Sequence, residues 1–208
     1  SVTGLGLKFS NLLLALSGGK LPILLALTMV AALILGMGMT TTSVYIILSV
    51  LVAPALIKMN VTPLAAHLFV FYFGILSAIT PPIATASYAA ASVAKDDPMK
   101  LGWAAWKIGL SGYILPFMFI SSPELLMEGS WSAIILATVS GTVGIFALSV
   151  AIEGYYRGEM NVILRVLLLA AAFCLLYSGL LTDFVGYGLC IAILVPRYIK
   201  SKRSYIQE

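Results

Sequence analysis

Long apolar stretches, separated by short polar segments, follow one another along most of the chain. Three of them cover residues 101–121, 131–151 and 162–181, and a further one surrounds 184–196. Each of the first three approaches the ~20 residues with which a helix crosses a hydrocarbon core of ~30 Å. Hydrophobic residues make up 61% of the 208 residues and charged residues 10%, against roughly 25% charged residues in a soluble domain. The pattern predicts an all-α polytopic membrane protein embedded in a lipid bilayer.

Two islands of small and polar residues interrupt the remaining apolar regions. The first island covers residues 36–43 and the second covers residues 77–82. Backbone groups that leave a helix inside a membrane cost roughly several kcal/mol each unless protein, water or an ion binds them. Paired interruptions of this kind are typical of the midplane sites of secondary transporters. The two islands are therefore the first candidates for a transport site.

Two topologies are compatible with the regions 21–57 and 64–94, which contain the islands. Each region exceeds one straight crossing at ~1.5 Å per residue, and is either one span broken in the middle or two short spans. Both arrangements place Lys20 in the cytoplasm. The loop 58–63 lies outside the cell with broken spans and inside it with four separate spans. We favour the broken spans.

Basic residues set the expected orientation. The positive-inside rule places the loops 95–100 and 153–165 in the cytoplasm, and segments 128–130 and 181–183 outside. The last apolar stretch is followed by four basic residues, which predict a cytoplasmic C-terminus unless they only solubilise the tail: Arg197, Lys200, Lys202 and Arg203. The net charge of +4 is too small and too scattered for nucleic-acid binding.

The first island offers oxygen ligands. Gly36 and Gly38 allow positive φ angles, so that backbone carbonyls can turn toward a bound cation. Hydroxyls follow them and can also cap the next helix: Thr40, Thr41, Thr42 and Ser43. Such a site suits a hard cation. The alternative is that the small residues only allow neighbouring helices to pack closely.

The second island predicts a helix break. Pro81 and Pro82 remove two backbone donors, and Pro81 moves Thr80 out of the helical region, so the preceding helix should end near Ile79. The next half-helix is expected to start with proline in its first turn, and its N-terminus would attract an anionic substrate group. Carbonyls of the preceding half-helix and the hydroxyls of Ser77 and Thr80 would face a cation. The alternative is a simple proline kink.

Other reactive side chains give weaker signals. His67, the only histidine, lies at membrane depth or at the interface. Cys174 and Cys190 lie in apolar stretches and are interpreted as small hydrophobic residues. Glu124 and Glu128 lie near the outer boundary and no carboxylate is expected deep in a span, which argues against a proton relay of Asp or Glu in this part of the chain. Phosphate-binding, zinc-protease and nucleophile-elbow motifs are missing from the sequence, so we do not expect an enzyme.

The islands, taken with residues 52–56, 65–74 and 97–100, resemble the large membrane subunit of tripartite ATP-independent periplasmic (TRAP) transporters. The similarity is to DctM-like fused permeases that work with TAXI-type binding proteins, and it covers roughly residues 34–127. It implies the second half of an inverted-repeat, elevator-type transporter in the bacterial inner membrane. Such a carrier imports organic acids with sodium as the coupling ion and no other cofactor.

The resemblance also implies partners and site residues. The partners are a periplasmic TAXI-type solute-binding protein, a small membrane subunit or its fused equivalent, and an N-terminal half without which we expect no transport. Residues 1–127 would form half of the transport domain, and 128–208 a C-terminal transmembrane extension. Gly36, Ser77 and Thr80 are the sodium candidates. The other predicted sodium- or substrate-binding residues at the two breaks are Gly38, Thr40, Thr41, Pro81, Pro82 and Ile83, and the stretch up to Pro54 would line a second ion site. The alternative function is a channel or a non-transporting membrane scaffold.

Overall fold

The computed structural model describes residues 4–177 and 179–206, without the side chains of 180 and 200–206. Helices dominate this part of the chain, and four segments are long and apolar enough to cross a membrane: Thr41–Lys58, Pro98–Ser121, Trp131–Glu153 and Leu181–Ile199. The prediction of an all-α polytopic membrane protein is confirmed. The chain divides into two compact units, Ser1–Ile120 and Ser121–Glu208, so the boundary expected after residue 127 falls inside the second unit.

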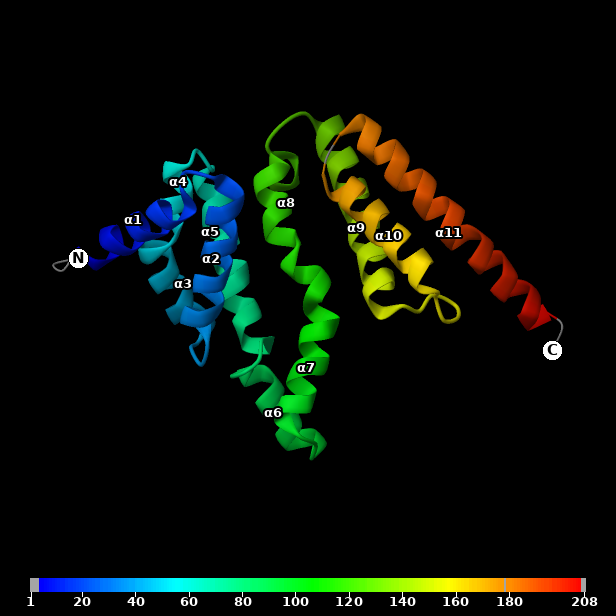
Figure 1. Cartoon of the computed structure of the whole chain (residues 1–208), viewed down its shortest axis with the longest axis horizontal. Helices are drawn as coiled ribbons and strands as arrows, with labels where there is room; N and C mark the ends of the chain where they lie inside the picture. The colour runs from blue at the N-terminus through cyan, green and yellow to red at the C-terminus, as the bar shows by residue number, and fades with distance from the viewer. Residues whose placement is uncertain (1–3, 178, 207–208) are drawn as a thin grey trace. The chain divides into compact units, whose positions relative to one another are not determined.

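Unit 1 contains eight α-helices and two 3₁₀ turns in its described residues (Figure 1). In chain order they are α1 (Leu5–Ser17), α2 (Leu21–Gly36), α3 (Thr41–Leu51), α4 (Ala53–Lys58), α5 (Pro63–Leu76), η1 (Ser77–Ile79), α6 (Thr85–Ala94), α7 (Pro98–Gly109), η2 (Leu110–Tyr113) and α8 (Leu115–Ser121).

The chain reverses direction at residues 37–40, between α2 and α3 (Figure 1). The end of α2 meets the end of α5, since a Cβ built on Gly36 would lie 2.5 Å from the Oγ of Ser77. The start of α3 meets the same end of α5, where Val44 contacts Gly74. Consequently α2 runs parallel to α5, α3 runs antiparallel to it, and the segment 21–58 is a helical hairpin.

The second interrupted region behaves differently, because α6 continues in the direction of α5 after the break (Figure 1). The 10 residues of α6 extend about 15 Å beyond the hairpin tip, and α7 returns beside them. The broken-span prediction is therefore right for 64–94 and wrong for 21–57. Lys20 and Lys58 lie at one end of the unit and Lys95 at the other, an arrangement that does not match the expectation that Lys20 and Lys95 share a side of the membrane. Counting apolar stretches does not detect the reversal at 37–40.

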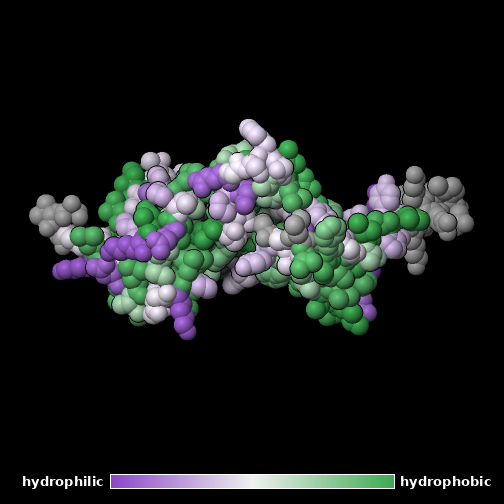
Figure 2. All heavy atoms as spheres, turned by 90° about the horizontal axis from the view of Figure 1, so that it is seen from above, coloured by the Kyte–Doolittle hydropathy of each residue, from purple (hydrophilic) through white to green (hydrophobic). Residues whose placement is uncertain are grey.

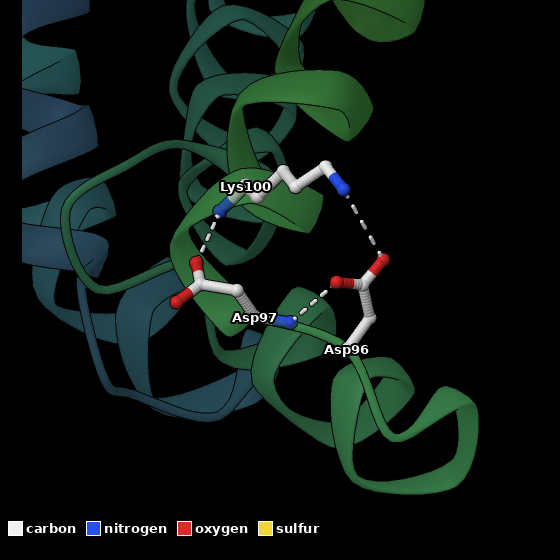
Figure 3. Close-up of polar contacts among 3 residues, drawn as sticks. All are labelled: Asp96, Asp97 and Lys100. Atoms are coloured by element: carbon white, nitrogen blue, oxygen red, sulfur yellow. Dashed lines mark hydrogen bonds and ion pairs between the residues drawn. The ribbon is translucent and has the colours of Figure 1, made fainter.

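The turn between α6 and α7 is closed by its acidic residues (Figure 3). Asp97 is the N-cap of α7, and its Oδ1 accepts a 2.7 Å hydrogen bond from the backbone N–H of Lys100. The Oδ1 of Asp96 accepts from the N–H of Asp97, and its Oδ2 lies 3.8 Å from the Nζ of Lys100. Residues 97–100, which belong to the segments that resemble TRAP permeases, thus form the start of α7.

Aromatic packing joins α5 to the span formed by α7, η2 and α8. Phe69 and Phe73 are fully buried on α5, and both contact Phe117 of α8, with ring centroids 5.2 and 5.8 Å apart. Phe73 also lies 6.1 Å from the ring of Tyr113 in η2. Burial of three or four large rings fixes these two spans against each other.

Unit 2 consists of the 3₁₀ turn η3 (Pro123–Leu126) and three long helices: α9 (Trp131–Glu153), α10 (Val162–Leu176) and α11 (Leu180–Ile206). The helices follow each other through short connections, and α10 packs on both α9 and α11. Gly186 allows the close approach of α11, since a Cβ there would lie 2.5 Å from the Cγ of Leu175. The turn expected at 181–183 is instead the first turn of α11, and Asp183 is only 7% exposed.

Two arginines bind backbone carbonyls at the end of unit 2 that contains the connection between α9 and α10. Arg165 of α10 donates 2.9 Å hydrogen bonds to the carbonyls of Ala151 and Ile152 in the last turn of α9. Arg197 of α11 donates to the carbonyls of Gly158 and Glu159 in the connection between α9 and α10. Cations at helix C-termini satisfy carbonyls that have no partner within the helix.

Large hydrophobic side chains are exposed on both units, and green hydrophobic atoms cover much of the face in Figure 2. Val93 and Ile108 of unit 1 are 85% and 77% exposed, and Leu181 and Phe184 of unit 2 are 84% and 75% exposed. Apolar surface on this scale is unusual for a soluble monomer. Lipid contact accounts for it in a chain with membrane-spanning helices.

Candidate functional site

The tip of the hairpin is the first part of the site. Gly36 is the buried last residue of α2, and Gly38 adopts a φ of 76°, a conformation that glycine enters without strain. Thr40 is the N-cap of α3, where its Oγ1 accepts from the N–H of Ser43 and donates to the Oγ of that residue at 2.9 Å. The predicted capping role of this island is confirmed. Thr41 is exposed at the start of α3.

The break between α5 and α6 is the second part. The α-helix ends at Leu76 and a 3₁₀ turn extends it to Ile79, as the two prolines predict. Thr80 is extended, with φ −91° and ψ 120°. Pro81 and Pro82 are joined by a cis peptide bond, and α6 begins only at Thr85. The expectation that a proline opens this helix is wrong, because Ala84, with a positive φ of 27°, first redirects the chain.

The 3₁₀ turn η2 is a third part, which the sequence analysis missed. It lies in the middle of the Pro98–Ser121 span, and its Tyr113 is buried. Pro116 gives the local signal, because its missing N–H interrupts the helical ladder in this segment. The hydroxyl of Tyr113 lies 2.5 Å from the Oγ1 of Thr80.

These three interruptions meet inside unit 1. Gly36 contacts Ser77, so the hairpin tip lies against the end of α5. A Cβ on Gly38 would lie 3.9 Å from the Cγ2 of Ile83, which connects the tip to the break before α6. The bond between Thr80 and Tyr113 connects that break to η2. Residues far apart in the sequence thus place non-helical backbone in one region.

The hydroxyls of the second break are engaged but retain oxygen lone pairs. Ser77 is 2% exposed, and its Oγ donates a 2.6 Å hydrogen bond to the carbonyl of Gly74. The Oγ1 of Thr80 donates to the carbonyl of Leu76 at 2.6 Å. A hydroxyl that donates its proton can still accept or ligate through its oxygen. Both side chains are therefore compatible with a cation, and neither requires one.

Gly36 has a packing role in the structure. Its Cα lies so close to Ser77 and Val44 that any side chain would overlap them. This favours the close-packing interpretation for Gly36 itself, while Gly38 has the free backbone geometry that was expected of both glycines. Pro82 and Ile83 are exposed beside the tip, and Pro81 is half-buried.

Pro54 lies apart from the other predicted site residues. It is the second residue of α4, and the 11 residues of α3 separate it from the hairpin tip, a length of about 16 Å. The structure does not bring it together with the two breaks. His67 also lies away from them, on the second turn of α5, with its Nδ1 3.2 Å from the hydroxyl of Tyr45.

An unpartnered hydroxyl lies close to the second break. Ser87, in the first turn of α6, is 3% exposed, and its Oγ has no hydrogen-bond partner among the described residues. It faces Gly102 of α7, as do Pro81 and Ala84. A buried hydroxyl without a partner costs about 1–3 kcal/mol. Sequence analysis missed it because serine in a small-residue helix gives no distinguishing signal.

The chemistry available at the site is that of neutral oxygens. In the described part of the chain, His, Cys, Asp and Glu residues form no group of three or more that could hold a metal ion. Carbonyls freed at the three interruptions, together with the hydroxyls of Ser77, Thr80 and Tyr113, are uncharged hard oxygen ligands, which suit hard cations and not soft metals.

Comparison with known families gives one match, to the model described as "Tripartite ATP-independent periplasmic transporter, DctM component", over residues 1–134. Comparisons with curated proteins and with solved structures found no significant match. The matched residues contain all of unit 1 and every part of the candidate site. The chain therefore belongs to the DctM family, the large membrane component of TRAP transporters.

Proposed function

We propose that this chain is part of the permease of a sodium-coupled secondary transporter that imports organic acids delivered by a periplasmic TAXI-type binding protein. The observation that carries the proposal is the meeting of three helix interruptions in unit 1: the hairpin tip, the break after Ser77–Ile79, and Leu110–Tyr113. Non-helical backbone at membrane depth is tolerated where it lines a site or is buried in protein.

Sodium would bind at the oxygen atoms of the second break and the hairpin tip. The candidate ligands are carbonyls at the end of α5 and the hydroxyls of Ser77 and Thr80, with Gly36 at the adjoining contact. The carbonyl end of α5 carries the negative end of its helix dipole, and the N-terminus of α6 carries a positive one. An organic acid carboxylate at the α6 side and a cation at the α5 side would each meet the favourable pole.

The permease would work in the bacterial inner membrane with a small membrane subunit or its fused equivalent, and with an N-terminal inverted half. Membership of the DctM family supports a binding protein and a small subunit in general. The elevator mechanism and a cytoplasmic C-terminus are part of the same proposal. Unit 2, which lies mostly outside the family match, would serve as scaffold or partner contact.

The test is sodium-dependent stability of the complete permease in lipid nanodiscs. A ligand that binds only the folded state raises the melting temperature as its concentration rises. We expect NaCl, but not choline chloride at the same ionic strength, to raise it. Thr80→Ala and Ser77→Ala should each shift the sodium dependence to at least tenfold higher concentration.

Ser92→Ala is the matched control, because the Oγ of Ser92 donates to the carbonyl of Ala89 in α6 in the manner in which Ser77 donates to Gly74. It should leave the sodium dependence unchanged. An identical sodium response in wild type, Thr80→Ala and Ser77→Ala would reject the assignment of these ligands. Absence of any response in the wild type would favour a channel or a scaffold.

A further inference from the structure

Unit 2 contains a buried carboxylate that the proposed transport site does not use. Asp183 lies in the first turn of α11 and is 7% exposed. Its Oδ2 accepts a 3.1 Å hydrogen bond from the Oγ of Ser140 on α9, and that Oγ lies 3.0 Å from the hydroxyl of Tyr187. Three oxygen-bearing side chains from two helices thus form one cluster.

The cluster leaves one atom without a partner. The Oδ1 of Asp183 is buried and has no hydrogen-bond partner among the described residues. With Ser140 donating to Oδ2 and Tyr187 donating to Ser140, both hydroxyl protons are directed toward the carboxylate and are used. A buried carboxylate with one bond and a bare second oxygen is costly unless a positive charge compensates it.

The arginines of unit 2 whose side chains the structure describes are bound elsewhere. Arg165 and Arg197 donate to backbone carbonyls, and Arg157 stacks 4.6 Å from the ring of Tyr198. Arg197 is 14 residues beyond Asp183 on the same helix, about 21 Å away. The N-terminal dipole of α11 supplies about half a positive charge. No basic side chain that the structure describes in unit 2 is bound to Asp183, which leaves its remaining charge open to compensation by a bound cation.

The formal charge and the ligand atoms of the cluster indicate which kind of cation would bind there. It offers one formal negative charge and only oxygen atoms, and the last carbonyls of α10 end close by, because Leu175 packs on Gly186. Calcium commonly takes six to eight oxygens with several carboxylates, and magnesium demands near-ideal octahedral geometry and keeps several waters. Structural zinc sites are built mainly from cysteine and histidine ligands. A single carboxylate balances one positive charge, so the cluster with its neutral oxygens matches a monovalent alkali cation.

We propose that Asp183, Ser140 and Tyr187 bind a single alkali cation, sodium or potassium, between α9 and α11. The site is independent of the transport site proposed in unit 1, and it ties the N-terminal turns of α11 to the middle of α9. Bound cation would stabilise this end of unit 2 in the way that Arg165 and Arg197 stabilise the other end.

Hydrogen–deuterium exchange of the full chain in nanodiscs tests the site locally. The peptide covering residues 179–190 is compared in NaCl, KCl and choline chloride at equal ionic strength. We expect about tenfold slower exchange in one of the alkali salts at ten times the dissociation constant, and the more protective salt identifies the ion. Equal exchange in all three salts would overturn the proposal.

Variants separate this site from the transport site. Asp183→Asn and Tyr187→Phe keep the side-chain shape, and either one should remove the salt effect on residues 179–190, so the test survives if one variant fails to fold. Thr80→Ala in unit 1 should leave it intact. Ser149→Ala is the matched hydroxyl control on α9, since its Oγ donates only to the carbonyl of Ile145. Protection that persists in both Asp183→Asn and Tyr187→Phe would assign the cation to other residues.

Discussion

Both units consist of apolar helices, but the helices of unit 1 are interrupted whereas the long helices α9 and α11 of unit 2 are continuous. In unit 1 the helices are interrupted at 37–40, at 77–84 and at Leu110–Tyr113, and the interruptions meet. In unit 2, α9 and α11 continue for 23 and 27 residues, and α11 does so through Pro196. Among the described residues, the interruptions that meet lie in unit 1, which the DctM family model covers completely, whereas α9 and α11 of unit 2 run on without a break.

The largest expected effect concerns the hairpin, because labelling from the two sides of the membrane is all-or-none. In a background with Cys174→Ala and Cys190→Ala, Lys20→Cys and Lys58→Cys should react with an impermeant thiol reagent from the same side. Met99→Cys, in the first turn of α7, should react only from the opposite side. Labelling of Lys20→Cys and Met99→Cys from one side would contradict the reversal at 37–40.

The next effect tests the packing of unit 2. Gly186→Ala places a Cβ 2.5 Å from the Cγ of Leu175 and 3.0 Å from the carbonyl oxygen of Ala171. Overpacking against backbone should destabilise the unit by about 2–3 kcal/mol, or roughly 5–10 °C in melting temperature. Gly188→Ala, on the same helix with no atom within 4 Å of its Cβ, should leave the melting temperature equal or higher. Equal melting temperatures for the two variants would contradict the close contact.

A smaller effect is expected at the hairpin contact in unit 1. Gly36→Ala overlaps the Oγ of Ser77 at 2.5 Å and Val44 at 3.1 Å, and should cost about 1–2 kcal/mol, since side chains rather than backbone can yield. Ser77→Ala removes the closest atom, so the double variant should recover about 1 kcal/mol relative to the sum of the single changes. Thermal unfolding of the four proteins measures this coupling, and additive effects would show that the tip does not touch α5.

The smallest effect is that of Tyr113→Phe, which removes the hydroxyl beside Thr80. The loss should be about 1 kcal/mol, a typical net value for one hydrogen bond, because Thr80 keeps its bond to the carbonyl of Leu76. Tyr88→Phe, on an exposed face of α6, is the control and should not change the melting temperature. A matching loss in both variants would assign the effect to the loss of a tyrosine hydroxyl in general and not to the bond with Thr80.

The helix ends and helix caps of the site were predictable from the sequence, whereas the direction in which the chain continues after each break was not. Pro81 and Thr80 end α5 where the steric rules for proline place the end, and Thr40 caps α3 as a threonine before a helix should. The reversal at 37–40 depends on the contacts of Gly36 and Val44 with α5, which no local pattern specifies.

The other differences between the sequence-based predictions and the structure also come from tertiary contacts that no local pattern specifies. Asp183 was assigned to an outer turn because polar residues between two apolar stretches favour a loop, yet its helix begins at Leu180 and packs it against Ser140. The family resemblance assigned the stretch up to Pro54 to a second ion site, and the length of α3 separates Pro54 from the two breaks. Tyr113 joined the site through a contact across 33 residues, which hydrophobic patterning does not record.

The hairpin of unit 1 is anchored at the end away from its tip. The Oγ of Ser10 on α1 donates to the carbonyl of Leu51 at 2.8 Å, and the Nζ of Lys58 donates to the Oδ1 of Asn11 at 2.8 Å. These bonds fasten α1 across the junction of α3 and α4. A rigid-body shift of the α2–α3 pair would therefore move α1 with it, although the two hydrogen bonds of α1 lie at the end of the hairpin away from its tip.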